Sequence, residues 1–234
     1  NYRSKFIKEA QIIAKLDNPY IIQIYDVFEE NGTAYYVMKY LDGESLGALI
    51  DNGLMLSVPV SCAYVRQVAE ALIYCHDRYI SHLDIKPGNI LIQDGSAVLI
   101  DFGVSKRYDD KGIQTSSTPA CVSKGYAPME QYKDGGLGQF SPTTDIYSLG
   151  ATLYRLVVGK VPPHAYDVYA DGLPAFPLEV PKNIQETITK AMSPKREDRH
   201  QSVKEFLDML DKGELENTEL ALEETQIVVE CAID

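Results

Sequence analysis

Apolar residues recur at helical spacing in several stretches of the chain, and this pattern is the first guide to its structure. The spacing predicts helices over residues 3–16, 60–78, 143–158, 183–192 and 202–212. Asp17-Asn18-Pro19 should end the first of them, because the residue before a proline is pushed out of helical geometry. Ser141-Pro142 offers an N-cap and first-turn proline for the third, and Gly159 suits its C-terminal cap.

Runs rich in β-branched and aromatic residues predict strands. Ile21–Phe28 and Ala34–Met38 flank Asn31-Gly32, a dipeptide typical of tight hairpin turns. Asp94-Gly95 lies between two further apolar runs and predicts a second hairpin. Leu41–Ser45 should break the preceding strand and cap a short helix. By contrast, residues 107–140 are rich in Gly, Ser, Thr and Lys, which is typical of a long mobile segment.

The order of these elements, one helix with a few strands and then a mainly helical body, predicts an α+β fold with two unequal lobes. The smaller lobe would cover residues 1–41 and the larger one residues 42–212. Of 34 acids, seven lie in residues 213–234, which contain none of the 22 bases and are expected to form an acidic tail or linker.

Composition limits the possible functions. The net charge of −12 argues against nucleic acid as a partner, because phosphate backbones would repel the chain. The longest apolar stretch, Ile146–Val158, contains Arg155 and is too short to span a bilayer, so no membrane segment is expected within the chain. The four cysteines have no C-x-x-C spacing, which argues against a zinc site and favours the reducing cytoplasm.

The second predicted hairpin brings oxygen ligands together. Folding the chain at Asp94-Gly95 places Asn89 across from Asp101 or one position away. An amide and a carboxylate oxygen side by side suit Mg²⁺, which shares its coordination shell with substrate phosphates. Asp84 and Lys86 lie in the loop that enters this hairpin, where one can accept a hydroxyl proton and the other can neutralise phosphoryl charge.

The stretch His82-Leu83-Asp84-Ile85-Lys86-Pro87-Gly88-Asn89, followed twelve residues later by Asp101-Phe102-Gly103, resembles the signature of eukaryotic-type (bacterial Hanks-type) serine/threonine protein kinases. The resemblance covers roughly residues 2–212 and implies a bilobal protein-kinase-like fold. It implies ATP-dependent phosphoryl transfer to Ser or Thr of proteins, with ATP and Mg²⁺ as cofactors. The implied roles are catalytic base for Asp84, γ-phosphate contact for Lys86, and metal and cofactor binding for Asn89 and Asp101.

Further positions resemble this family. Glu9 corresponds to the helix acid that pairs with a nucleotide-binding lysine, and so counts among the catalytic residues. Met38 corresponds to the gatekeeper beside adenine. The Lys39 carbonyl and the Leu41 amide would bond the base, and Leu91 would lie beneath it. Residues 125–131 resemble the end of the activation segment as it occurs in bacterial members of the family. The protein substrate is expected to dock near Ser123–Glu130.

Within this segment, Ser123 stands where a threonine is expected, and Glu130 should pair with Arg199. Asp145 corresponds to the start of a buried helix. His82 is expected to be structural, and His76, His164 and His200 are given no role.

The sequence departs from the family pattern at two important places. Only eight residues precede Glu9, so the glycine-rich loop and the lysine-bearing strand are not in this sequence. The family pattern places them just upstream, so the domain is expected to be N-terminally truncated, and the chain by itself is expected to hold ATP poorly. Leu83 replaces the arginine that normally binds a phosphate group on the activation loop. We therefore expect that activity does not depend on a phosphate group bound at this position. Hydroxyls that could be phosphorylated are nevertheless present at Thr115, Ser116, Ser117 and Thr118.

Two alternatives remain open at this point. The missing lysine and Leu83 favour a catalytically impaired, kinase-like (pseudokinase) interaction module. A small-molecule kinase would share the His-x-Asp motif but would lack the segment Tyr126–Glu130. Localisation is expected to be cytoplasmic, or tethered to a membrane through segments outside these residues.

Overall fold

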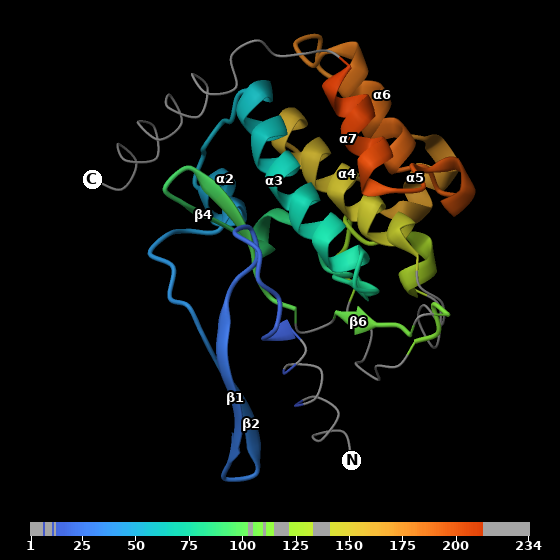
Figure 1. Cartoon of the computed structure of the whole chain (residues 1–234). Helices are drawn as coiled ribbons and strands as arrows, with labels where there is room; N and C mark the ends of the chain where they lie inside the picture. Colours follow the sequence, from blue (N-terminus) through green and yellow to red (C-terminus); the bar gives the residue numbers. More distant parts are fainter. Residues whose placement is uncertain are drawn as a thin grey trace.

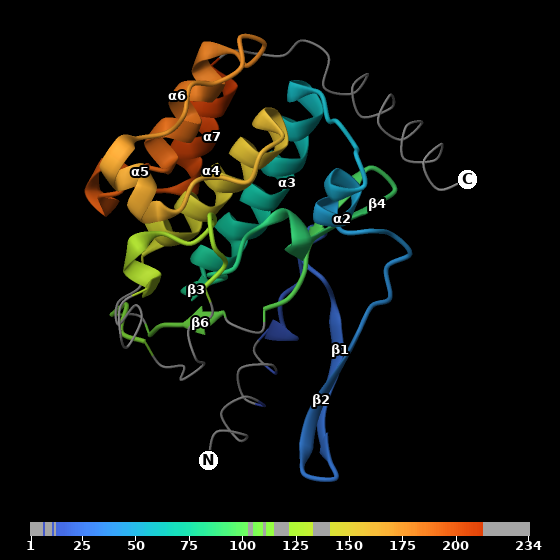
Figure 2. The ribbon, with the colours of Figure 1, turned by 180° about the vertical axis from the view of Figure 1, so that it is seen from behind.

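Two helices, α3 (Val58–His76) and α4 (Pro142–Val158), lie side by side at the centre of the molecule (Figure 1). The structure, a computed structural model, describes residues 7, 11, 13–102, 105–109, 111–114, 122–132 and 141–212. On the side of the helical body away from the hairpin of residues 24–38 lie α5, α6 and α7, which span Ala165–Asp171, Lys182–Ala191 and Val203–Asp211 (Figures 1 and 2). Helices therefore form the body of the protein, as predicted.

Local capping chemistry explains where the helices begin and end. Ser57 caps α3 by accepting from the Val60 amide, and Pro59 lies in the first turn, where its missing N–H is not needed. The helix thus begins two residues earlier than the periodicity predicted. Gly159 ends α4 with a φ of 74°, which confirms its predicted capping role. Helix α5 was not predicted, because its seven residues are too few to show periodicity.

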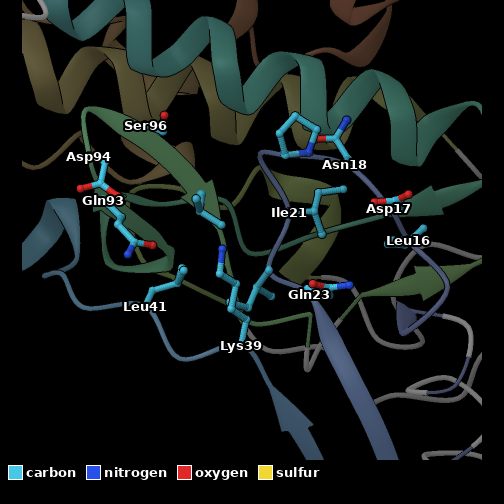
Figure 3. Close-up of a pocket in the computed structure, with 13 residues that line it drawn as sticks. Leu16, Asp17, Asn18, Ile21, Gln23, Lys39, Leu41, Gln93, Asp94 and Ser96 are labelled. Atoms are coloured by element: carbon cyan, nitrogen blue, oxygen red, sulfur yellow. The ribbon is translucent and has the colours of Figure 1, made fainter.

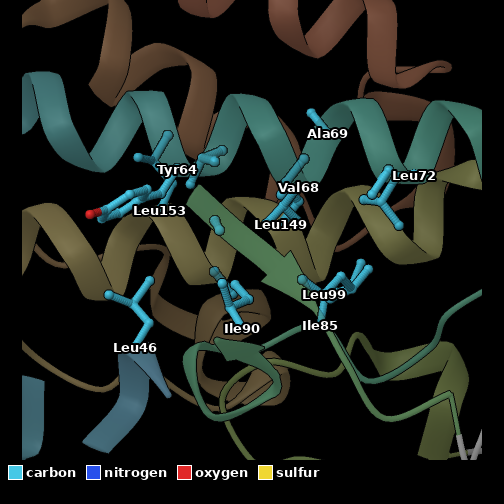
Figure 4. Packing of buried hydrophobic residues seen from close by; sticks show 14 of the residues in the cluster. Leu46, Tyr64, Val68, Ala69, Leu72, Ile85, Ile90, Leu99, Leu149 and Leu153 are labelled. Carbon is cyan, nitrogen blue, oxygen red and sulfur yellow. The ribbon is translucent and has the colours of Figure 1, made fainter. Parts of the chain in front are cut away.

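Apolar side chains from α3, α4 and the strands form one core. Leu46 of α2 (Leu46–Asp51), Val68 and Leu72 of α3, and Leu149 of α4 all point into it (Figure 4). Ser45 caps α2 by accepting from the Ala48 amide, as predicted. The same core reaches the region that carries the predicted chemistry, since it includes the buried side chains of Ile85, Ile90 and Leu99.

Both predicted hairpins are present. Strands β1 (Ile24–Glu30) and β2 (Thr33–Met38) pair antiparallel around Asn31 and Gly32, whose φ angles of 49° and 73° are left-handed as such a turn requires. This hairpin extends away from the helical body (Figure 1). Strands β4 (Ile90–Gln93) and β5 (Ser96–Leu99) pair antiparallel around Asp94-Gly95. A third pair joins β3 (Ile80–Ser81) to β6 (Lys106–Arg107).

Part of the segment predicted to be mobile is packed instead. Residues 122–132 lie on the helical body and include the 3-10 turn η2 (Met129–Tyr132), in which Glu130 and Gln131 are buried. Gly125 has a φ of 86°, and a Cβ there would lie 2.7 Å from the Pro162 carbonyl oxygen. Only glycine allows this close approach. Composition did not reveal this packing, because the contacts come from residues distant in sequence.

Within the ranges described, no helix combines the length and apolar character that a bilayer-spanning segment needs.

Candidate active site

The loop between β3 and β4, residues 82–89, carries the predicted catalytic residues, and we call it the catalytic loop. It leads from β3 past Asp84 and Lys86 into the 3-10 turn η1 (Pro87–Asn89), directly before β4. The side chain of Ile85 points into the core, and β4 is paired with β5. The loop is therefore fixed at both ends and at its middle.

Three donors surround the Asp84 carboxylate. The side-chain amide of Asn89 donates to Asp84 Oδ2 and to the Asp84 carbonyl oxygen, both at 2.8 Å. Lys86 Nζ donates at 2.8 Å to Asp84 Oδ2 and at 2.8 Å to Ser123 Oγ. The Ser123 hydroxyl in turn donates to Asp84 Oδ1. The structure thus brings together Asp84, Lys86 and Asn89 with Ser123 of the predicted substrate segment.

These contacts determine the charge of Asp84. Burial acts to raise the pKa of this carboxyl, but hydrogen bonds from Lys86 and Ser123, together with the Lys86 charge and the Asn89 amide, outweigh burial and lower the pKa. Asp84 is therefore ionised at neutral pH and acts as a hydrogen-bond acceptor.

Asp101 lies one register step from Asn89. The β4–β5 register puts Ile100 opposite Asn89, with the Ile100 amide donating to the Asn89 carbonyl at 2.9 Å, so Asp101 is one position away, as the hairpin predicted. Asp101 is exposed and has a φ of 58°. Left-handed backbone at a non-glycine residue persists only where its surroundings hold it.

The charges of both Asp84 and Asp101 act on His82. Its Nε2 is 3.1 Å from the Ile100 carbonyl, and its ring packs edge-on against Phe102 at 4.6 Å. Burial lowers the pKa of His82, while the charges of Asp145, Asp84 and Asp101 act to raise it. The negative charges of Asp84 and Asp101 thus both act on the His82 imidazole. The packing of His82 against Ile100 and Phe102 is consistent with the structural role expected for it.

Asp145 anchors the catalytic loop from the first turn of α4. Its carboxylate is fully buried and accepts from the amides of His82 and Leu83 at 3.0 and 2.8 Å. His76 Nε2 lies 2.8 Å from the same carboxylate. His76 was given no role from the sequence, yet it contacts the carboxylate that anchors the loop. The signal available in the sequence was a histidine at the end of the helix that leads into the loop.

The predicted pairing of Glu130 with Arg199 is present. Arg199 Nη1 and Nη2 donate to the two Glu130 oxygens at 2.6 and 3.1 Å, and the pair is buried. Thr144 of α4 also donates to Glu130 at 3.1 Å. This pair fixes η2 to the helical body.

The residues predicted to bind the adenine lie at the end of β2 and beyond. Met38 ends β2 with 48% of its surface exposed, and the Lys39 amide donates to the Gln23 carbonyl at 2.8 Å. Leu41 is buried, and Leu91 of β4 bridges to Ser45. These residues therefore border the β4–β5 hairpin without contacting the Asp84 cluster in any described bond.

A pocket of about 430 Å³ lies beside Lys39 and Leu41 (Figure 3). Its other walls come from residues 16–23 and from the β4–β5 hairpin, including Gln93 and Asp94. Neither Asp84, Asn89 nor Asp101 lines it. The pocket is thus separate from the cluster around Asp84.

The donor set suits Mg²⁺. The two bonds from Asn89 to Asp84 use its amide nitrogen, which leaves its side-chain oxygen as the atom able to ligate a metal. Asp101 supplies a carboxylate nearby. In the described part of the chain no group of three or more His, Cys, Asp or Glu residues could hold a metal. Two oxygen ligands suit an ion that takes the rest of its coordination shell from phosphate and water. Glu9 and Gly103 lie outside the described residues.

The chain belongs to the protein kinase domain family, whose family model matches residues 1–215. It is 32% identical to a probable serine/threonine-protein kinase of Clostridium acetobutylicum over 223 residues, covering 88% of this chain and 32% of the relative. It is 32% identical to the serine/threonine-protein kinase PrkC of Bacillus subtilis, covering 80% of this chain and 30% of that protein. A probable serine/threonine-protein kinase PknB of Bifidobacterium longum is 31% identical, covering 88% and 32%. The chain spans about a third of the length of these curated relatives.

Proposed function

We propose that the protein transfers the γ-phosphoryl group of ATP to a serine or threonine hydroxyl of a protein substrate. The observation that carries this proposal is the Asp84 carboxylate, which accepts hydrogen bonds from Lys86, Asn89 and Ser123. Family membership and the names of the relatives support it and do not favour a non-catalytic module.

Asp84 acts as the general base. The substrate hydroxyl oxygen forms a bond to the γ-phosphorus while its proton passes to Asp84, the bond to the β-phosphate oxygen breaks, and ADP leaves. The low pKa of Asp84 keeps the carboxylate ready to accept. Its role is chiefly to orient the hydroxyl, since phosphoryl transfer depends on position and charge more than on a strong base.

Lys86 stabilises the transferred phosphoryl group. Its ammonium carries three N–H donors, and Asp84 and Ser123 take two of them. The third can donate to a γ-phosphate oxygen. Asn89 and Asp101 would hold Mg²⁺, which would supply positive charge to neutralise the phosphates.

The remaining predicted residues complete the proposal. Met38, Lys39, Leu41 and Leu91 contact the adenine, and Glu9 belongs to the nucleotide-binding part of the site. Residues 1–212 act as the kinase unit, with 213–234 as an acidic tail. The protein substrate docks near Ser123–Glu130, because Ser123 bonds both Asp84 and Lys86. The kinase unit acts in the cytoplasm, free or tethered to a membrane through segments outside these residues.

Transfer of radiolabelled phosphate from ATP by the full-length protein tests the proposal. Asp84→Ala should lower labelling by at least ~10²-fold, because the proton acceptor is lost. Asp208→Ala is the matched control, since Asp208 lies exposed on α7, away from the loop, and should label like the wild type. Equal labelling by Asp84→Ala and wild type would refute the base, and absence of labelling by the wild type would refute the activity.

A further inference from the structure

Leu83, next to the catalytic base, has an unusual backbone conformation. Its φ is 67°, and its side chain is buried. A bulky residue with left-handed backbone persists only where neighbouring groups hold it. The Leu83 amide donates to Asp145 Oδ1 at 2.8 Å, which holds one side of the residue.

Gln131 holds the other side. Its Nε2 donates to the Leu83 carbonyl at 2.8 Å, across 48 residues of sequence. Only the amide nitrogen can serve here, because a carbonyl accepts and never donates. Leu83 is thus clamped between a carboxylate of α4 and an amide of η2.

The burial of Gln131 indicates that this bond matters. The side chain is 5% exposed, and its Oε1 has no hydrogen-bond partner among the described residues. Burying an amide whose oxygen is unpaired costs free energy that an apolar side chain of similar length would avoid. The bond to Leu83 is the one described contact that offsets this cost.

The turn that carries Gln131 cannot move freely. Its neighbour Glu130 is paired with Arg199 and accepts from Thr144. The position of η2 is therefore transmitted to Leu83, and through one peptide unit to Asp84. Ser123 makes the second link from the same segment to the catalytic loop.

We propose that Gln131 is a positioning residue for phosphoryl transfer. Its side chain joins η2, at the end of the predicted substrate segment, to the catalytic loop by a neutral hydrogen bond. This inference rests on the proposed kinase activity. Leu83 cannot read a phosphate as arginine would, whereas the Gln131 amide makes its connection without any added charge. The catalytic loop is therefore assembled without phosphorylation of Thr115, Ser116, Ser117 or Thr118, which lie outside the described residues.

The first test compares Gln131→Met with Gln185→Met in the full-length protein. Gln185 is the matched control, because its Nε2 also donates to a backbone carbonyl, that of Val180, at 2.8 Å. Gln131→Met should lower kcat about tenfold, which is the loss expected when one hydrogen bond that supports the transition-state geometry is removed. KM for ATP should stay within about twofold of the wild-type value. Gln185→Met should leave both constants unchanged.

Hydrogen exchange distinguishes positioning from general loosening. The peptide that contains Leu83 and Asp84 should exchange faster in Gln131→Met and not in Gln185→Met. Gln131→Leu also removes the donor without adding a charge, and provides a second variant should Gln131→Met fail to fold. Unchanged kcat in an active, folded Gln131 variant would overturn the positioning role while leaving the proposed kinase activity intact.

A separate experiment tests whether the catalytic loop is assembled without phosphorylation. The variant with all four residues, Thr115, Ser116, Ser117 and Thr118, changed to Ala should keep kcat within about twofold of wild type. A loss as large as that of Gln131→Met would show that a phosphate there is needed, and would overturn this part of the inference. Absence of phosphoryl transfer by the wild type would instead count against the proposed function.

Discussion

The catalytic loop and the β1–β2 hairpin show two opposite ways of holding a chain segment. The loop has little regular structure, yet it is bound by the side chains of Asp145, Gln131 and Ser123, of which the first two are buried. The hairpin is paired antiparallel, with one register shift between Ile24 and Asp26, yet most of its side chains are exposed. Regular secondary structure therefore does not indicate which segment is better fixed.

The difference follows from where each segment finds its partners. Strands β1 and β2 satisfy each other's backbone groups, and a two-stranded hairpin without a covered face is marginally stable in water. Phe28 and Tyr35 stack on each other at 5.4 Å but remain 39% and 43% exposed. The loop instead draws on α4 and η2, which belong to the core.

The largest effect should come from breaking the buried ion pair that fixes η2. Arg199→Met should lower the free energy of unfolding by about 3–5 kcal/mol, because Glu130 is left buried and unpaired. Arg66→Met, which removes a partly exposed pair with Asp211, should cost about 0–1 kcal/mol. Urea unfolding measures both, and equal costs would contradict the assigned importance of burial.

A smaller, pH-dependent effect should come from Asp145. Burial acts to raise the pKa of this carboxyl, but hydrogen bonds from His76 and the Leu83 amide outweigh burial and lower the pKa. Its contribution to stability is therefore present at neutral pH and lost as the pH falls below the ordinary Asp value of about 3.9.

Asp145→Asn should cost about 1.5–3 kcal/mol at pH 7, as expected for hydrogen bonds to a charged group, and should lose less stability than wild type on acidification. Unfolding measured from pH 7 to pH 3 checks this. Parallel curves for the two proteins would show that the charge of Asp145 does not stabilise the loop.

The smallest effect is expected in the hairpin. Phe28→Ala should cost about 0.5–1.5 kcal/mol, the contribution of an aromatic pair. Phe206→Ala in α7 should cost about 3–5 kcal/mol, because that side chain is fully buried. If Phe28→Ala were as costly as Phe206→Ala, the hairpin would be as firmly packed as the core, and the comparison would fail.

Local signals predicted much of the fold. Asn31-Gly32 and Asp94-Gly95 marked both hairpins, and Gly159 marked the end of α4, because each depends on backbone conformations that few residues adopt. The Asp94-Gly95 turn alone was enough to place Asp101 one step from Asn89, since antiparallel pairing fixes every later position.

Other features could not be read in this way. The short helix α5 lacks periodicity, and the packing of residues 122–132 was hidden by a composition typical of loops. The roles of His76 and Gln131 were missed because each depends on one partner, Asp145 or Leu83, that no spacing rule connects to it.

The sequence by itself determined the order of helices and turns and the chemistry available to the catalytic loop, because residue type and short-range spacing carry that information. Only the tertiary structure decided which groups hold Leu83 and Asp84 in place. Those contacts span 39 to 62 residues of chain, and they form where the packing of α3, α4 and η2 brings the groups together.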